Sequence, residues 1–195
     1  MPYGEEIQGD NEFEAPFACG RKRAKPNVHR KRAGEGLDDG YHLYPDRRRQ
    51  LYLASVMDLY TRKIVGFHMG ERMTKELVIA ALDQAYNRQR PAPGLLHHSD
   101  RGSQYASTEY QKRLEKYQMI GSMSRKGNCY DNACIESFHS VLKKELVYLE
   151  KFKTREQAKR AIFEYITCFY NGKRIHSSIG YFTPNQYEHT YRCVV

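Results

Sequence analysis

Two acidic residues, Asp100 and Glu136, have the spacing and surroundings of a metal-binding pair. Asp100 follows a short apolar run at 94–96, and Glu136 comes after 35 intervening residues, inside a helical pattern. Carboxylates that converge from a strand end and a helix can share divalent cations, and two such ions stabilise the attacking and leaving oxygens of a phosphoryl transfer. The alternative is a solvated loop aspartate and a surface glutamate, which two acids on their own would favour.

Three longer stretches around these acids change that balance. They are HHSDRGSQYAS at 97–107, SMSRKGNCYDNACIESFHSVLKKEL at 122–146 and YNGKRIHSSIGYFTPNQYE at 170–188. In this order they resemble the catalytic core of insertion-sequence transposases related to retroviral integrases, the DDE enzymes. The resemblance extends from residue 51 to residue 187 and is to the product of such an element's second reading frame.

The resemblance implies an α/β fold of the ribonuclease-H-like type, in which a mixed sheet is flanked by helices. It also implies metal-dependent cleavage and joining of DNA strands. By position, Asp100 resembles the second carboxylate of the catalytic triad and Glu136 the third, so both would hold Mg²⁺ or Mn²⁺ in a two-metal site. The implied partners are DNA, at the element ends and the target, and further copies of the chain in an active homo-oligomer.

Basic and polar residues near these acids are candidates for binding the DNA backbone, because such side chains bind phosphates. The candidates are Arg101, Arg125, Lys126, Asn132, Lys143, Lys144, Arg174 and His176. Simpler interpretations exist for most of them. The stretch 125–132 could be an ordinary turn, the two adjacent lysines could be solvated, and the last two residues could dock against the final helix.

The composition fits one basic domain with a sizeable core. The chain has 195 residues, is 40% hydrophobic and carries a formal net charge of +9, which suits a polyanionic partner. Its five cysteines include no CxxC pair, so we expect reduced thiols rather than disulfides or a zinc site. No membrane-spanning run or signal-peptide pattern is present. Together with this composition, the resemblance to insertion-sequence transposases implies a cytoplasmic, nucleoid-associated bacterial protein.

Residues 1–50 show no regular hydrophobic period and mix acids with three basic clusters. We interpret them as an irregular segment, either a disordered basic arm or a tail that binds the DNA backbone. The catalytic core is then expected at 51–190. No helix-turn-helix pattern precedes this core, so we expect a fragment or second-frame product without the sequence-specific DNA-binding part of a whole transposase.

The core begins with two predicted strands at 51–60 and 64–69, which are joined closely enough to form an antiparallel hairpin. Asp58 lies at the end of the first strand, where capping the turn is a better interpretation than catalysis. A helix that begins after Thr74 follows, then a short strand at 95–98. A helix between two strands in this order fits a parallel pairing.

His97 and His98 lie next to each other on that short strand and must point to opposite faces, so we expect packing or hydrogen-bonding roles rather than a joint metal site. The later elements are a helix at 108–118, a strand at 119–124 and the Glu136 helix. A last long helix should begin after Thr154, with Gln157 as its capping-box partner.

A third acid should lie on the first, central strand of a ribonuclease-H-like site, and none is in register there. In the family, the sequence motif W-x-x-D-I-T-Y-I comes just before the hairpin. The corresponding stretch here is LDDGYHLYPD at 37–46, with Gly40 at the triad position. Asp39 is one residue away, and a one-residue slip turns a strand side chain to the other face.

A frameshift would explain the missing acid. Allowed codons for 37–50, read one base forward, spell W-T-T-D-I-T-Y-I-P-T-D-E-G, and the same shift across 20–37 also gives a family-like stretch. The alternative is that the free choice of third bases produces this match. We expect residues 4–50 to be out-of-frame translation, which would leave the first strand missing or disrupted.

The sequence thus predicts a transposase or integrase core for DNA strand cleavage and strand transfer, impaired in this copy because catalytic acids act as a unit. Two alternatives stay open. One is an inactive remnant that binds DNA non-specifically, and the other is a ribonuclease-H-like nuclease that cleaves without joining. If the reading frame is intact, Asp38 or Asp39 would have to serve as an unorthodox third ligand.

Overall fold

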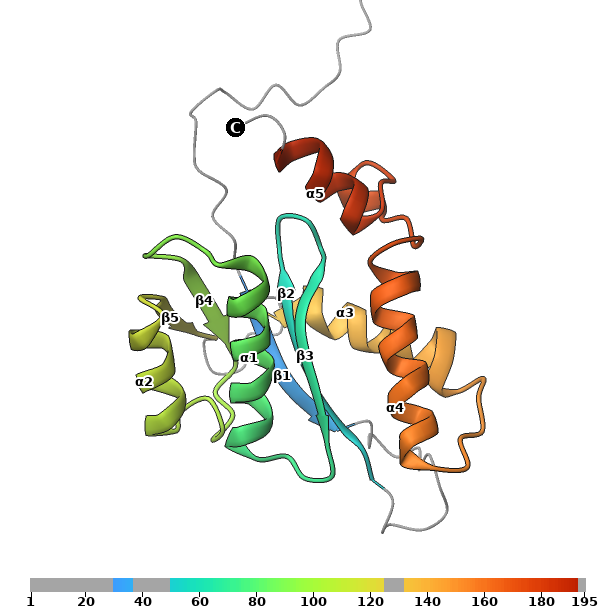
Figure 1. The fold of residues 1–195 in the computed structure, drawn as a ribbon, viewed down its shortest axis with the longest axis horizontal. Coiled ribbons are helices and arrows are strands. Elements are labelled where there is room, and N and C mark those ends of the chain that lie inside the picture. Colours follow the sequence, from blue (N-terminus) through green and yellow to red (C-terminus); the bar gives the residue numbers. More distant parts are fainter. Residues whose placement is uncertain (1–29, 37–49, 125–131, 193–195) are drawn as a thin grey trace, which may run out of the picture.

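The sheet at the centre of the molecule is mixed, and helices cover both of its faces (Figure 1). The computed structural model describes residues 30–36, 50–124 and 132–192. Within these ranges five strands pair in the order β3-β2-β1-β4-β5. This arrangement confirms the predicted α/β class.

The predicted hairpin consists of β2 (Tyr52–Asp58) and β3 (Ile64–Gly70), which pair antiparallel. Helices cover both faces of β2, which explains why its residues are apolar in succession rather than in alternation. At its end, the buried Asp58 carboxylate accepts hydrogen bonds from the Tyr60 N–H and the Thr61 hydroxyl, both at 3.0 Å. The prediction that Asp58 caps the turn is confirmed.

The central position of the sheet is occupied by β1 (Arg30–Gly36), which is antiparallel to β2 and parallel to β4 (Leu96–Ser99). The expectation that this strand would be missing is wrong. A strand forms from residues 30–36, which precede the stretch at 37–46 where the family resemblance placed it. Its ladder to β2 contains two register shifts, which agrees with the expected disruption. Residues 37–49 lie outside the described part of the chain.

The sheet is completed by β5 (Ile120–Met123), which pairs in parallel with β4. The parallel pairing expected between the strands at 64–69 and 95–98 does not form, because β2 and β1 lie between them in the sheet. The crossover between them is α2 (Thr108–Lys116). Its N-cap is Ser107, whose hydroxyl accepts a hydrogen bond from the Tyr110 N–H. This crossover fixes the strand end from which Asp100 emerges.

One face of the sheet is covered by α1 (Lys75–Gln89) together with α2. The helix begins after Thr74, as predicted, although the Thr74 side chain makes no capping hydrogen bond. Close approach of α1 to β3 depends on Gly66, where a Cβ would lie 2.3 Å from the Ala81 carbonyl oxygen. Any side chain at that position would push the helix away from the sheet.

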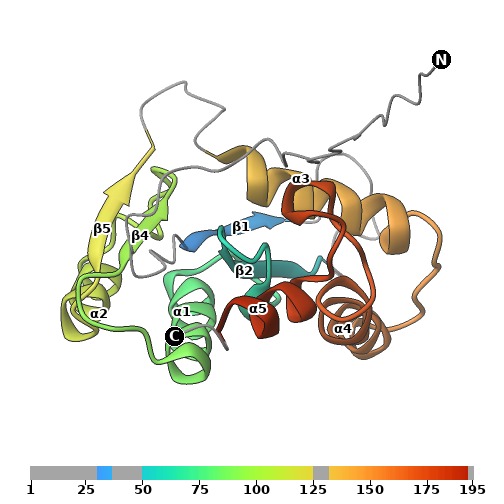
Figure 2. The same cartoon turned by 90° about the horizontal axis from the view of Figure 1, so that it is seen from above.

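The other face is covered by two longer helical segments. The first is α3 (Ala133–Leu142), which continues into the π-helical turn η3 (Lys143–Val147). The second is α4 (Arg155–Glu164), which continues into η4 (Tyr165–Tyr170). Figure 2 shows α3 and α1 on opposite sides of β1 and β2. The apolar core on this side contains Leu53, Met57, Phe67, Ile135, Phe138, Ile162 and Ile166.

The predicted cap of α4 forms with one difference. The Thr154 hydroxyl accepts a hydrogen bond from the Gln157 N–H at 3.1 Å, but the Gln157 side chain bonds to the Lys153 N–H rather than to that of Thr154. The chain then passes through η5 (Ser177–Ile179) to α5 (Pro184–Arg192). Across the described residues, no helix has the length and apolar character needed to cross a membrane.

Candidate active site

The two histidines of β4 lie just before Asp100 and face opposite ways. His97 is buried, and its Nε2 lies 2.8 Å from the Tyr110 hydroxyl of α2. The Nδ1 and Nε2 atoms of His98 lie 3.0 Å from the hydroxyls of Ser122 and Ser124, respectively. The predicted hydrogen-bonding roles of both histidines are therefore confirmed.

Asp100 is half-buried and is held by the turn that follows β4. Its Oδ1 accepts a hydrogen bond from the Gly102 N–H at 2.9 Å. A Cβ at residue 102 would lie 3.1 Å from this oxygen and 2.9 Å from the Gln104 Oε1, so a glycine leaves the carboxylate uncrowded. Burial, and then the charge of Asp100, raise the pKa of the Tyr110 hydroxyl, so that tyrosine stays a neutral neighbour of the acid.

Glu136 lies in the first turn of α3, where a negative charge interacts favourably with the helix dipole. It is half-buried, whereas Ile135 and Phe138 beside it are buried against the sheet. The same helix is attached to β2 by a buried hydrogen bond of 2.8 Å between the Ser55 hydroxyl and the His139 Nε2. Both apolar packing and this polar contact therefore hold the helix that carries the second acid.

Ser124, the residue after β5, joins the two elements that carry the acids. Its N–H donates to the Ser99 carbonyl at 2.9 Å, and its own carbonyl accepts a hydrogen bond from the Arg101 Nε at 2.9 Å. Its hydroxyl donates to the Asn132 Oδ1 at 2.9 Å. The residues on both sides of Asp100 and the N-cap residue of α3 thus meet at one serine.

Asp100 and Glu136 have the chemical type of group that binds divalent cations. Their carboxylate oxygens are the ligands that Mg²⁺ prefers in proteins. A complete site is not present among the described residues, where no three His, Cys, Asp or Glu side chains come together in a way that could hold a metal ion. Asp38 and Asp39, the other acids considered from the sequence, lie outside these residues.

Three of the predicted DNA-binding cations lie on the elements that carry the acids. Arg101 follows Asp100 and is exposed, although its Nε bonds to the Ser124 carbonyl. Lys143 is half-buried and Lys144 is exposed, at the point where α3 continues into η3. Contact of these three cations with DNA stays a prediction.

Asn132 was also predicted to contact DNA, but the structure places it inside the molecule. It is only 8% exposed, and its Oδ1 accepts the hydrogen bond from Ser124. Arg125 and Lys126, in the loop between β5 and α3, lie outside the described residues. A role of these three in DNA binding stays a prediction.

Arg174 and His176 contact the C-terminal helical segments. The Arg174 Nε lies 3.1 and 3.2 Å from the two carboxylate oxygens of Glu145. The His176 ring packs edge-on against Tyr170, with ring centroids 4.9 Å apart. Burial, and then the charges of Arg174 and Arg62, lower the pKa of His176 to about 4. These contacts support docking within the chain, and DNA contact by either residue stays a prediction.

Sequence reasoning missed three residues that support the site: Ser55, Ser124 and His139. Ser55 had one weak signal, because it interrupts an apolar strand and a buried hydroxyl needs a partner. His139 lies three residues after Glu136, which indicates a neighbouring position on the helix but not its partner. Nothing in the sequence around Ser124 indicates that it joins two distant elements.

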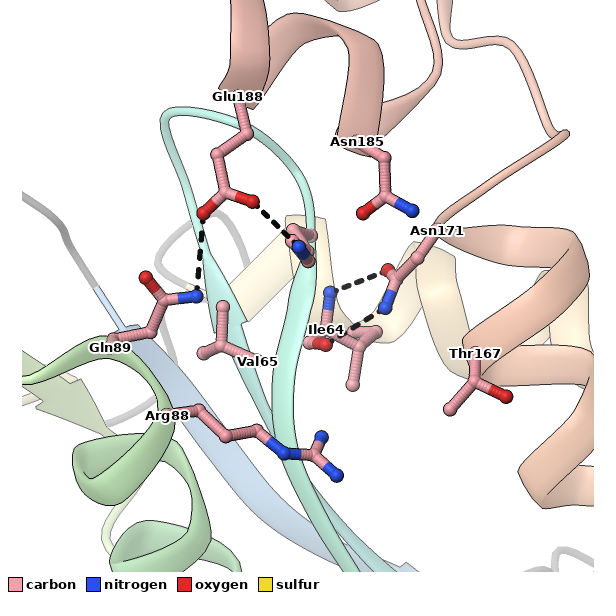
Figure 3. Close-up of a pocket in the computed structure, with 9 residues that line it drawn as sticks. Ile64, Val65, Arg88, Gln89, Thr167, Asn171, Asn185 and Glu188 are labelled. Atoms are coloured by element: carbon pink, nitrogen blue, oxygen red, sulfur yellow. Dashed lines mark hydrogen bonds and ion pairs between the residues drawn. The ribbon is translucent and has the colours of Figure 1, made fainter. Parts of the chain in front are cut away.

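A cavity of about 370 Å³ lies elsewhere, between β3, the end of α1, η4 and α5 (Figure 3). Lys63 and Glu188 form an ion pair of 2.6 Å in its wall. The Asn171 side chain bonds to both the N–H and the carbonyl of Ile64, at 2.9 and 3.0 Å, and so covers part of the edge strand. Neither acid lines this cavity, which is therefore separate from the candidate active site.

The sequence matches two family profiles with the same description. Integrase core domain is the description of a profile that matches residues 38–129 and of a second that matches residues 136–191. Together these ranges contain most of the chain and both acids. The first match begins at Asp38, in the stretch where the first acid is expected.

The curated relatives are proteins of bacterial insertion elements. The transposase for insertion sequence element IS904 of Lactococcus lactis is 46% identical over 144 residues, which are 74% of this chain and 57% of the relative. The uncharacterized 31 kDa protein of insertion element IS600 of Shigella sonnei is 50% identical over 141 residues, 72% of this chain and 52% of the relative. The chain spans about half the length of these relatives.

Solved viral integrases share the fold at low sequence identity. The catalytic core domain of HTLV-2 integrase, in complex with magnesium, has a TM-score of 0.59 and 16% identity, over 84% of this chain and 97% of that one. A chain of the simian T-cell lymphotropic virus intasome has a TM-score of 0.65 and 16% identity, over 87% and 56%. These likenesses show the ribonuclease-H-like fold. Together with the profile matches and the transposase relatives, they show that the chain belongs to the integrase core domain family, among the insertion-sequence transposases.

Proposed function

We propose that this chain is the catalytic-core portion of an insertion-sequence transposase, a DDE-type polynucleotidyl transferase that cleaves DNA and joins the released 3′-hydroxyl to target DNA. The observation that carries the proposal is the junction at Ser124. Ser99 and Arg101, on either side of Asp100, and Asn132, one helical turn before Glu136, all bond to this residue. The elements that carry the two family acids therefore adjoin at this residue.

In this proposal Asp100 and Glu136 are the ligands that remain for a divalent cation, Mg²⁺ or Mn²⁺. Bound cations would supply Lewis-acid stabilisation of the phosphoryl oxygens. The described residues hold two acids where the family uses three, so they would hold only part of a two-metal site. What the chain itself contributes is the position of two carboxylates and a basic surface next to them.

DNA is the proposed partner, bound through its phosphates. Lys143 and Lys144 lie about two helical turns beyond Glu136, and neutralising a phosphate with a lysine releases counterions. We expect the slope of log affinity against log salt concentration to fall by about 1 for each of Lys143→Ala and Lys144→Ala. Lys151→Ala, at an exposed position after η3, is the control. Equal slopes for all three variants would contradict the proposed surface.

We also propose that catalysis is impaired in this copy, because the first-strand acid is absent and the three acids act as a unit. The nucleotide sequence across codons 4–51 tests the proposed cause. A forward-shifted reading frame that encodes the family's first-strand motif with its Asp would support a frameshift as the cause. Any other sequence would mean that Asp38 and Asp39 have to be tested as the third ligand, by replacing each with Asn.

The proposed chemistry is tested with a labelled DNA duplex that carries an element end, incubated with the full chain and Mn²⁺. We expect cleaved and joined products at a trace level, and we expect Asp100→Asn and Glu136→Gln each to remove them. Cleavage without joining would favour the nuclease alternative. Complete absence of metal-dependent products would favour the DNA-binding remnant, and products unaffected by both substitutions would contradict the assignment of the acids.

A homo-oligomer is the expected active form. The HTLV-2 integrase core has been solved in trimeric and dimeric forms, and assembly of this chain is proposed by analogy with them. Light scattering of the full chain with and without DNA checks this, because an active assembly should exceed the mass of one chain when DNA is bound.

A further inference from the structure

The N-cap of α3 is unusual in the way that it uses its side chain. Asparagine is a favoured N-cap residue because its side-chain oxygen accepts a hydrogen bond from the helix's own first N–H groups. The Asn132 side chain makes no such bond to α3. Its Oδ1 instead accepts the Ser124 hydroxyl at 2.9 Å, in a buried position. The start of the Glu136 helix is therefore attached to the end of β5.

The hydroxyl of Ser124 has two further partners, the Ser99 carbonyl at 3.4 Å and the His98 Nε2 at 3.0 Å. A serine has one hydroxyl hydrogen, and the Asn132 amide oxygen at 2.9 Å is the nearer of its two acceptors, so Ser124 donates to Asn132. Ser124 Oγ must then accept a hydrogen bond from the His98 Nε2, which lies 3.0 Å away. In a neutral imidazole the Nδ1 is then the acceptor for the Ser122 hydroxyl, also at 3.0 Å. His98 thus supports the same hydroxyl from the Asp100 strand.

We propose that Ser124 is a positioning residue of the site, whose hydroxyl holds the first turn of α3, and with it Glu136, in place relative to Asp100. This inference rests on the proposed function for the roles of the two acids. The backbone of Ser124 bonds to Ser99 and Arg101 whatever its side chain is. Only the hydroxyl reaches the Glu136 helix, so removing it should release one acid from the other without unpairing β5.

The first variant is Ser124→Ala in the full chain, followed by amide hydrogen exchange. The N–H groups of residues 137–139 report on the first turn of α3, because they bond one turn back along the helix. We expect their exchange to rise about tenfold or more, since the start of the helix loses its attachment. Unchanged exchange at 137–139 would overturn the proposal.

Asn132→Ala cuts the same hydrogen bond from the other side and leaves His98 paired with Ser124. It should raise exchange at 137–139 by a similar factor, and the double variant should raise it no further, because both changes remove one interaction. Additive effects would overturn the proposal. Asn132→Ala also provides the test if Ser124→Ala fails to fold.

Ser107→Ala is the matched control, because Ser107 is a serine that caps another helix, α2. It should speed exchange in α2 while leaving residues 137–139 unchanged. If it speeds exchange at 137–139 as much as Ser124→Ala does, the effect is general loosening and the proposal fails.

Mn²⁺ binding, followed by electron paramagnetic resonance, links the positioning role to the site. We expect Ser124→Ala to weaken the Mn²⁺ affinity about tenfold, as loss of a supporting residue around a metal site usually does, whereas Ser107→Ala should leave it unchanged. If the unaltered chain shows no Mn²⁺ binding that depends on Asp100 and Glu136, the proposed function fails on that point. The exchange result still decides the role of Ser124.

Discussion

The strand that leads to Asp100 and the strand at the centre of the sheet are built in different ways. β4 pairs with β5 through four consecutive residue pairs, and its side chains bond to Tyr110 and to two serines of the neighbouring segment. β1 pairs with β4 through only two residue pairs, and its ladder to β2 shifts register twice. The sheet therefore has a regular acid-bearing side and an irregular centre.

This difference teaches that the fold of the core depends less on the sequence of its central strand than catalysis does. Backbone N–H and C=O groups are the same in every residue except proline, so a foreign segment can still satisfy the exposed edges of β2 and β4. A catalytic carboxylate, in contrast, must come from one residue in one register. A core that lost its third acid, as proposed for this chain, would thus keep its sheet and the other two acids.

The comparison would fail if β1 were not part of the sheet in solution, and Ala33→Pro tests this. Ala33 pairs with Ala54 of β2, and proline in a central strand removes a ladder hydrogen bond and disturbs its neighbours. We expect a loss of roughly 3 kcal/mol in the free energy of unfolding. Chemical denaturation measures it, with Ala33→Ser as the control. Equal stability of the two variants would mean that β1 is not part of the sheet in solution.

The regular half of the comparison is sharpened by Gly66→Ala in β3. A Cβ there would lie 2.3 Å from the Ala81 carbonyl oxygen and 2.7 Å from the Ala85 Cβ. We expect a loss of roughly 2–3 kcal/mol, since overpacking of this kind forces backbone shifts. Gly121→Ala in β5 is the control, because a Cβ at that position meets its nearest neighbour, a Leu114 methyl, at 3.4 Å. Similar melting temperatures for both variants would contradict the tight contact of α1 with β3.

Attachment of the Glu136 helix to β2 is tested by Ser55→Ala. This change removes the buried hydrogen bond to the His139 Nε2, and we expect a loss of about 1–2 kcal/mol because a buried polar atom loses this partner. Ser140→Ala, at an exposed position of the same helix, should change the stability by less than about 0.5 kcal/mol. A Ser55→Ala chain as stable as the Ser140→Ala chain would mean that apolar packing alone holds α3.

The smallest effect concerns His176, whose neutral ring is favoured by burial and by the nearby Arg174 and Arg62. Its pKa is lowered to about 4 in the folded chain, while Glu145 acts in the opposite direction. Between the unfolded pKa near 6.5 and the folded value, the unfolded chain binds more protons. The stability contributed by His176 is therefore present above pH 6.5 and lost as the pH falls toward 4.

Because the His176 ring is only half-buried, we expect this loss to be about 1 kcal/mol after allowance for solvent screening. Urea unfolding at several pH values between 7 and 4 measures it. His176→Gln should flatten the profile in this window, and His68→Gln, at an exposed position of β3, should not. Parallel profiles for the unaltered chain and His176→Gln would show that other groups cause the acid sensitivity.

Much of the fold could be predicted because its elements are encoded locally. The hairpin around Asp58, the helix that follows Thr74 and the cap at Thr154 depend on neighbouring residues, and all three were predicted. The stretches that resemble the family also indicated Asp100 and Glu136 as candidate site residues. The central strand could not be predicted, because Arg30–Gly36 has no hydrophobic alternation and its pairing is set by the edges of β2 and β4.

The residues that support the site could not be predicted from the sequence for a different reason. Ser55 and His139 are 84 residues apart, and Ser124 bonds to residues of two separate segments, 98–101 and the start of α3. Such contacts exist only once the chain has folded, so residue type and spacing do not indicate them. Asn132 shows the same limit, because its type favoured a DNA contact or a helix cap, whereas tertiary structure directs its oxygen to a serine.

The most direct test of the central claim is to restore the family's first-strand motif, which we expect to take the place of β1 in the sheet, and to measure catalysis. Residues 37–50 are replaced by W-T-T-D-I-T-Y-I-P-T-D-E-G, and Mn²⁺-dependent cleavage and joining of an element end is compared with that of the chain as written. We predict a rise of at least about 10³-fold, since the acids act as a unit, and its loss when Asp100→Asn is added. Equal activity of the rebuilt and unaltered chains would contradict the claim that the missing acid is what separates this protein from an active transposase core.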